Sequence, residues 1–266
     1  MPLTVRFLGT RGAFPLNIPQ TQLLGTETSC VVLETGQDRL ILDAGTGLNH
    51  LEPSERTDII LLSHFHYDHI LGLPYFLSRK TQGKVILVTS CASDIGDFAS
   101  KLAKVFGGIG FPVRLSEIFK HIDLRVFDPS APLTISKWII DTIELNHPGK
   151  AFGYRVQYEG RRGKICYLMD HEQGDSDPCE ALINFAKNTE LIIYDAAYSD
   201  AEYAQFRGYG HSTIEQGQIF SNMTNCRRIM LMGHAMERLD SRIQEIEDQL
   251  NASIERLARD GDVIVI

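Results

Sequence analysis

The chain has 266 residues, of which 43% are hydrophobic and 23% are charged, so it can bury a sizeable core. Its formal net charge of −8 disfavours non-specific binding to nucleic acid, because phosphates attract Lys and Arg. No repeat, low-complexity tract or linker divides the sequence. We therefore expect one domain over residues 1–266.

The cysteines and the apolar runs indicate in which cellular compartment the protein is expected. Five cysteines are scattered, with no CxxC pair, which favours reduced thiols over a disulfide framework. The first residues lack the charged start and apolar stretch of a secretory signal. No apolar run approaches the length that crosses a bilayer. We expect a cytoplasmic protein that does not contact a membrane.

Short apolar runs of strand length recur along the chain. They cover residues 3–9, 29–35, 39–45, 58–63, 84–90, 138–145, 151–159, 164–170, 190–196, 228–234 and 263–266. Helices are predicted from residue 70, over 93–106, and over 177–189, where Asp177 and Pro178 suit a helix start. A last helix is predicted over 239–257, because apolar residues recur there at three- and four-residue steps. These elements predict an α/β protein with two sheets covered by helices.

The densest group of polar residues is "HFHYDH", which follows the predicted strand 58–63. It contains His64, His66, Asp68 and His69, which are costly to bury unless something pairs with them. A loop between a strand and a helix is a frequent place for functional residues. Imidazole and carboxylate without thiolate suit zinc, with manganese or iron as alternatives.

Three further residues that can bind metal each follow a predicted strand, namely His147, Asp170 and His234. Loops after strands can bring distant ligands over one cleft. One Zn²⁺ would take His64, His66 and His147, a second would take Asp68, His69 and His234, and Asp170 would bridge them. Each ion would keep an open position, as catalytic zinc requires. The sequence therefore predicts two divalent metal ions, with zinc as the expected metal.

This set of residues resembles the metallo-β-lactamase superfamily over essentially the whole chain. "HFHYDH" matches the HxHxDH signature of that family in full, and His147, Asp170 and His234 follow in order at its later ligand positions. The resemblance implies a four-layered αβ/βα sandwich of two mixed sheets flanked by helices. It also implies a dinuclear site at the edge of the two sheets.

Two later segments resemble the phosphodiesterase branch, which contains ribonuclease Z and small cyclic-phosphate diesterases. These segments are "YDAAY" at 194–198 and "GHST" at 210–213. Ribonuclease Z has a glutamate in a His-Glu-Ala-Thr stretch that orients the histidine of its His-Ser-Thr segment. Here Asp195 stands at the glutamate position and His211 is the histidine. The shorter carboxylate, and the lack of a recognisable Gly/Pro-rich arm for gripping tRNA, separate this chain from ribonuclease Z proper.

The resemblance implies hydrolysis by water activated between two metal ions. Asp68 would orient this water as well as bind metal, and His211, held by Asp195, would stabilise charge or protonate the leaving oxygen. A purely structural Asp–His hydrogen bond is the alternative for that pair. Asp43 is expected to fix a ligand imidazole. The loop over 9–15 could cradle phosphate with help from Arg11, or could be a turn.

We expect a hydrolase that acts on a small cyclic phosphate or a cyclic nucleotide, with nucleic acid not a partner. Whether the chain forms a homodimer stays open. The alternatives are a ribonuclease Z-like nuclease, a thioesterase or lactonase with the same metals, and a metal-binding sensor or accessory protein without turnover. The full ligand set together with Asp195 and His211 favours catalysis.

Overall fold

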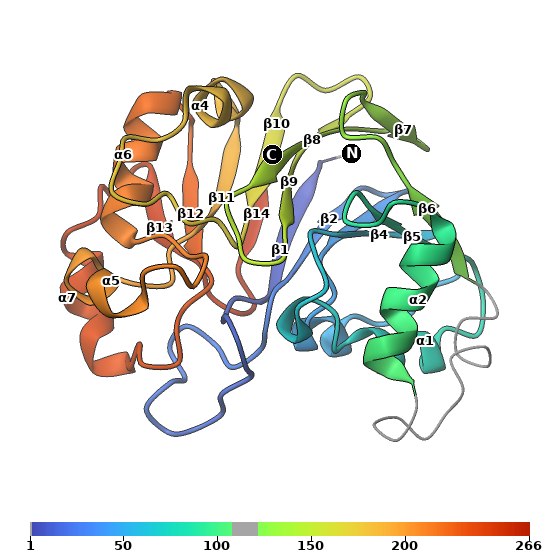
Figure 1. The fold of residues 1–266 in the computed structure, drawn as a ribbon, viewed down its shortest axis with the longest axis horizontal. Coiled ribbons are helices and arrows are strands. Elements are labelled where there is room, and N and C mark those ends of the chain that lie inside the picture. The colour runs from blue at the N-terminus through green and yellow to red at the C-terminus, as the bar shows by residue number, and fades with distance from the viewer. Residues whose placement is uncertain (1, 108–121) are drawn as a thin grey trace.

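The computed structural model describes residues 2–107 and 122–266. Within these residues the strands form two seven-stranded sheets that pack against each other, and helices cover the outer face of each sheet (Figure 1). Both sheets contain parallel and antiparallel pairs. The α/β class and the predicted arrangement of two mixed sheets flanked by helices are confirmed.

The first sheet comes from the N-terminal half and the last strand. Its order is β14 (Val263–Val265), β1 (Thr4–Gly9), β2 (Cys30–Glu34), β3 (Arg39–Leu42), β4 (Asp58–Leu62), β5 (Val85–Thr89) and β6 (Ile122–Val126). Strands β3 to β6 run parallel, so their carboxyl ends lie at one edge. Helices η1 (Thr46–His50), α1 (Leu73–Arg79) and α2 (Ile95–Phe106) contribute apolar residues to the cluster on its outer face.

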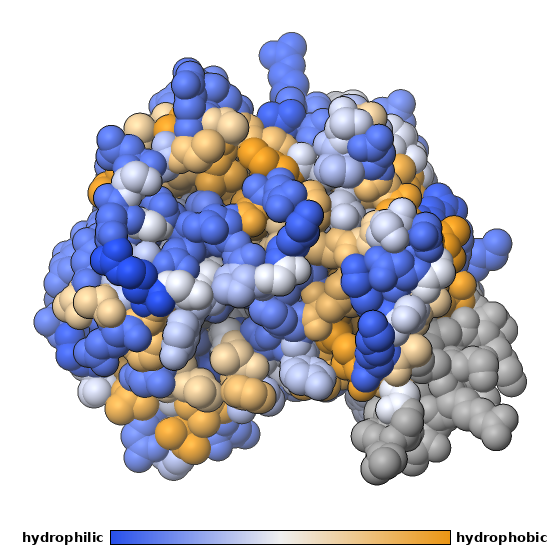
Figure 2. All heavy atoms as spheres, viewed as in Figure 1, coloured by the Kyte–Doolittle hydropathy of each residue, from blue (hydrophilic) through white to orange (hydrophobic). Residues whose placement is uncertain are grey.

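The second sheet comes from the C-terminal half. Its order is β13 (Glu255–Leu257), β12 (Ile229–Met232), β11 (Leu191–Asp195), β10 (Lys164–Leu168), β9 (Ala151–Tyr158), β8 (Trp138–Leu145) and β7 (Leu133–Ile135). Strands β10 to β13 run parallel. Helices α4 (Glu180–Ala186), α6 (Ile214–Thr224) and α7 (Ile243–Glu247) cover it, and α5 (Asp200–Phe206) lies beside α6. Hydrophilic residues cover much of the helical side drawn on the left of Figure 2.

One apolar cluster fills the space between the sheets. It contains Phe7 and Leu61 from the first sheet and Trp138, Tyr167 and Met230 from the second. Burying this surface from water is the main force that holds the two sheets together. The shared cluster supports the proposal that residues 1–266 form one domain.

The predicted helix over 239–257 is wrong beyond its first turns. The structure has a 3-10 turn at η4 (Asp240–Arg242), then α7, and the last predicted turn is instead strand β13. The side chain of Asn251 accepts hydrogen bonds from the backbone N–H and hydroxyl of Ser253, which offers the backbone an alternative to the helix. Ile243 and Leu257 still pack in the same cluster, which explains the apolar spacing.

The other differences are smaller. Helix α4 begins at Glu180 after a cap at Cys179, so Asp177 and Pro178 precede it and the predicted range of 177–189 is too long. Strands β6, β7 and β13 and helices α5 and α6 were not predicted from the sequence. In the portion of the chain that is described, no helix is long and apolar enough to cross a bilayer.

Candidate metal centre

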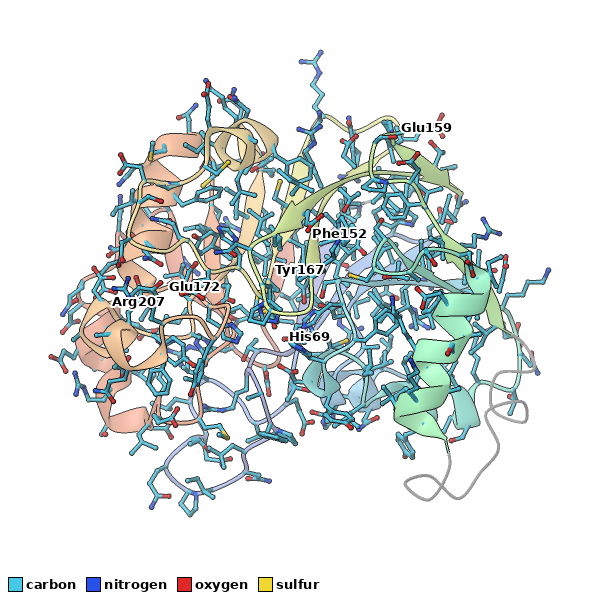
Figure 3. All side chains as sticks on the ribbon, in the orientation of Figure 1. His69, Phe152, Glu159, Tyr167, Glu172 and Arg207 are labelled. Carbon is cyan, nitrogen blue, oxygen red and sulfur yellow. The ribbon has the colours of Figure 1, made fainter. Side chains whose placement is uncertain are left out.

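The candidate centre lies where loops after the parallel strands of both sheets meet. His64 follows β4, and Asp68 and His69 lie in the 3-10 turn η2 (Tyr67–His69). Asp170 follows β10, and Asp195 ends β11. Figure 3 shows His69 and Tyr167 at the middle of the molecule, between the two halves. The fold therefore gathers residues that are more than 100 positions apart in the sequence.

Six of the seven predicted metal ligands come together in two overlapping groups. In each group one possible ligand atom per residue lies within 4.8 Å of the others. The first group is His64, His66, His147 and Asp170, and the second is Asp68, His69 and Asp170. Asp170 belongs to both, as expected for a residue that bridges two ions.

Asp43 orients two of these imidazoles. Its Oδ2 lies 2.6 Å from Nδ1 of His69 and accepts a hydrogen bond of 2.7 Å from the hydroxyl of Ser63. Since that hydroxyl has one hydrogen, Ser63 must accept a hydrogen bond from Nδ1 of His64, which is 3.0 Å away. The hydroxyl of Tyr167 donates to the same carboxylate at 2.9 Å. Asp43 thus fixes His69 directly, as predicted, and His64 through Ser63.

His147 is oriented by the backbone. Its Nδ1 donates to the carbonyl oxygen of Gly210 at 2.9 Å, which leaves Nε2 directed at the cluster. Burial lowers the pKa of His147 to about 4, so the ring is neutral and can offer a lone pair. A second-sphere hydrogen bond of this kind is typical of histidines that bind metal.

The cluster has the unsatisfied atoms that a cation would satisfy. Nε2 of His64 and Nε2 of His69 are buried and make no hydrogen bond within the described residues. They lie 3.2 Å and 3.1 Å from oxygens of Asp170. Burial alone would raise the pKa of Asp170, but the imidazoles of His69 and His64 hold it well below its usual range. Buried polar atoms that converge without hydrogen bonds, with an ionised carboxylate among them, fit divalent cations.

Asp68 is held by the loop over residues 9–15. The backbone N–H of Ala13 donates to Oδ2 of Asp68 at 2.8 Å. Arg11 is fully buried, and its guanidinium donates to the carbonyl oxygens of Thr21, Gly25 and Ala235. Arg11 is therefore a structural residue that fixes the loop, and the loop positions a carboxylate of the cluster.

Asp195 and His211 form the predicted pair. Nδ1 of His211 lies 2.7 Å from Oδ2 of Asp195, which also accepts a hydrogen bond from the backbone N–H of His171. Burial lowers the pKa of His211, but the charges of Asp195 and Asp170 raise it to about 10. His211 and Asp195 form a third group with Asp170, so the pair lies against the cluster.

His234 is the one predicted ligand that the structure does not bring to the cluster. It follows β12, but its ring nitrogens lie near the carbonyl oxygen of Ala258 and the guanidinium of Arg238, at 2.8 Å and 2.9 Å. No candidate metal group among the described residues includes it.

Glu172 was not singled out from the sequence, and Gly210 was noted only as part of "GHST", with no role of its own. The carboxylate of Glu172 accepts hydrogen bonds from the backbone N–H groups of Gly208 and Gly210 and from the hydroxyl of Tyr203. Figure 3 shows Glu172 between Arg207, on the side of α5, and the centrally placed Tyr167 and His69. Two glycines just before His211 signal a loop that needs backbone freedom, and this was the available clue.

Comparisons with known proteins show which family this chain is similar to. A model of the beta-lactamase superfamily domain matches residues 38–234. A ribonuclease Z of Haloarcula marismortui is 22% identical over 315 aligned positions, which cover 100% of this chain and 94% of that enzyme. The structure of the metallo-beta-lactamase fold protein YhfI from Bacillus subtilis is 18% identical, with a TM-score of 0.75 and full coverage of both chains. A diphosphatase of the PhnP family is 16% identical, with a TM-score of 0.71 and coverage of 100% and 98%.

Proposed function

The chain belongs to the beta-lactamase superfamily and is a metal-dependent hydrolase, and we propose that it cleaves small phosphodiesters. The observation that carries the proposal is the convergence of buried, unsatisfied imidazole nitrogens on Asp170, beside the Asp195–His211 pair. The residues proposed to hold two divalent cations, with zinc as the expected metal, are His64, His66, Asp68, His69, His147 and Asp170.

Each part of the site has a proposed role. When bound, the cations would supply Lewis-acid activation of water and of the phosphoryl oxygens. Asp68, which Ala13 holds in place, would orient the attacking water. His211 keeps its Nδ1 on Asp195, so Nε2 is the nitrogen left to stabilise a phosphoryl oxygen or to give its proton to the leaving oxygen.

A compact substrate suits the charges around the site. Arg11 and Arg238 are both buried and donate to backbone carbonyl oxygens, so they cannot turn toward a polyanion. Lys150, in the turn beside His66, is exposed and lies 3.9 Å from Glu144. Nucleic-acid binding depends on many free cations that neutralise phosphates. Two metal ions and one histidine are enough for a single phosphodiester.

The names of the relatives favour a nuclease instead. The Haloarcula relative is a ribonuclease Z, so the expectation that nucleic acid is not a substrate is weakened. That alignment spans 315 positions against the 266 residues of this chain, so the relative contains segments that this chain lacks. We keep a ribonuclease Z-like nuclease as the second candidate. We propose a small phosphodiester first, because the basic side chains Arg11, Arg238 and Lys150 already have partners within the protein.

A panel of substrates tests the proposal. Purified protein loaded with Zn²⁺ or Mn²⁺ should release p-nitrophenol from bis(p-nitrophenyl) phosphate and open at least one cyclic nucleotide. Precursor tRNA should be cut weakly. Efficient cleavage of tRNA with steep salt dependence, and no reaction with small diesters, would establish the nuclease instead. Activity on thioesters or lactones alone would overturn both phosphodiester functions.

A further inference from the structure

His234 is fully buried, and both of its ring nitrogens have partners in the structure. Nδ1 lies 2.9 Å from a guanidinium nitrogen of Arg238. Nε2 lies 2.8 Å from the carbonyl oxygen of Ala258, the residue that follows β13. The ring therefore faces the neighbouring strand of the sheet and the buried guanidinium, and it does not face Asp170.

The two partners determine which nitrogen carries the proton. A guanidinium can only donate, so Nδ1 of His234 must accept from Arg238. A carbonyl oxygen can only accept, so Nε2 must carry the hydrogen and donate to Ala258. His64 and His147 have the opposite arrangement, because Nδ1 donates in both and Nε2 is left for the cluster. His234 has no nitrogen left with which to bind a metal ion.

Arg238 connects His234 to the Asp195–His211 pair. Its guanidinium donates to the carbonyl oxygens of Ala196 and Ala197 at 2.8 Å and 2.9 Å. These residues directly follow Asp195, whose Oδ1 accepts a hydrogen bond from the backbone N–H of Ala197. His234 thus offers the acceptor that holds the guanidinium at the loop carrying Asp195.

We infer that His234 is not a metal ligand but a positioning residue, which acts through Arg238 on Asp195 and His211. One consequence concerns the metal ions, and it rests on the proposed metal-dependent function. The group around His147 offers four protein ligands, whereas the group around His69 offers three. The two ions should therefore bind in two separate steps, with the His147 group filled first.

Metal titration tests this inference without any measurement of hydrolysis. Metal-free protein is titrated with Zn²⁺ in a calorimeter, with a competing chelator where binding is tight, and the wild type is compared with His234→Ala and His69→Ala. We expect two steps in the wild type, the same two steps with His234→Ala, and loss of the weaker step with His69→Ala. Loss of a step with His234→Ala, or weakening beyond the roughly 10–100-fold that outer-sphere partners cost, would overturn the inference. A single step in every protein would overturn the two-step filling.

A measurement on the unaltered chain covers the case in which His234→Ala does not fold. Histidine ring nitrogens are observed by long-range proton–nitrogen spectra before and after Zn²⁺ is added. We expect the rings of His64, His69 and His147 to change and His234 to keep its proton on Nε2. A change of His234 to a metal-bound nitrogen would refute the assignment.

Steady-state kinetics then distinguish a role of His234 in positioning the Asp195–His211 pair from a role in the stability of the fold alone. His234→Ala should lower kcat by up to about 10²-fold, as a misplaced catalytic group does, with little change in KM. His234→Asn keeps an acceptor near Nδ1 and should recover part of that loss. Equal kcat in the wild type and His234→Ala would remove the positioning role. If the wild type cleaves no phosphodiester, the proposed function fails while the titration and the spectra still decide the role of His234.

Discussion

The carboxylate of Glu172 holds the backbone of Gly210, whose N–H donates to Oε2 at 2.9 Å. The carbonyl oxygen of Gly210 in turn accepts the hydrogen bond from Nδ1 of His147. A chain of contacts thus runs from Glu172 through one backbone residue to a proposed metal ligand. Burial alone would raise the pKa of Glu172, but hydrogen bonds from Tyr203 and the two glycines lower it.

Replacing Glu172 with Gln should weaken metal binding at the His147 group. The amide keeps the size of the side chain but puts a donor where Tyr203 or a backbone N–H now donates. We expect a loss of about 10–100-fold in metal affinity, the usual cost of an outer-sphere partner, measured by competition with a chelator. Glu180→Gln, on the exposed start of α4, is the control and should change nothing. Equal affinities in the two variants would contradict the role of Glu172.

Gly210 should not tolerate a side chain. Its φ of +90° is unfavourable for other residues, and a Cβ there would overlap Nδ1 of His147. Gly210→Ala should displace His147 and lower metal content, measured by elemental analysis of gently purified protein. Gly208 also has a positive φ, of +85°, but nothing lies within 4 Å of its Cβ position. Gly208→Ala is therefore the matched control and should retain its metal.

His211→Ala should lower turnover and leave metal content intact. If His211 is a general acid, the loss is about 10²–10⁴-fold in kcat. Steady-state kinetics and metal analysis on the same preparation check both parts. Unchanged turnover would leave the Asp195–His211 pair as a structural hydrogen bond, and a loss of metal would make His211 a ligand.

A stability prediction concerns a site away from the cluster. Asp58 is fully buried between Arg39 and Lys80, with its oxygens 2.5 Å and 2.7 Å from their nitrogens. Asp58→Ala would leave the buried Lys80 without its carboxylate partner and Arg39 with only the more distant Glu34, 3.9 Å away, so we expect the free energy of unfolding to fall by about 3–5 kcal/mol. Urea unfolding measures it. Asp123→Ala, which breaks an exposed pair with Arg125, should have little effect, and similar losses in both would contradict the account.

The sequence alone predicted those features that depend on residues close together in the chain. Each predicted strand appears in the structure, because short β-branched and apolar runs bounded by polar residues are typical of strands. The cluster around His64 was found for the same reason, since its residues are adjacent in the chain. The position of His234 could not be predicted, because it depends on Arg238 and on Ala258, which follows strand β13. The helix expected through Leu257 failed because apolar spacing does not distinguish a helix from a turn followed by a strand.

The central claim is that hydrolysis of a phosphodiester depends on metal ions held through Asp170. The most direct measurement follows release of p-nitrophenol from bis(p-nitrophenyl) phosphate as Zn²⁺ or Mn²⁺ is added back to chelator-treated protein. We predict no activity without metal and a rise in activity that saturates near two ions per chain. Asp170→Ala should neither bind two metal ions nor hydrolyse the substrate, since Asp170 belongs to both groups. Activity that survives the chelator, or that is equal in Asp170→Ala, would contradict the claim.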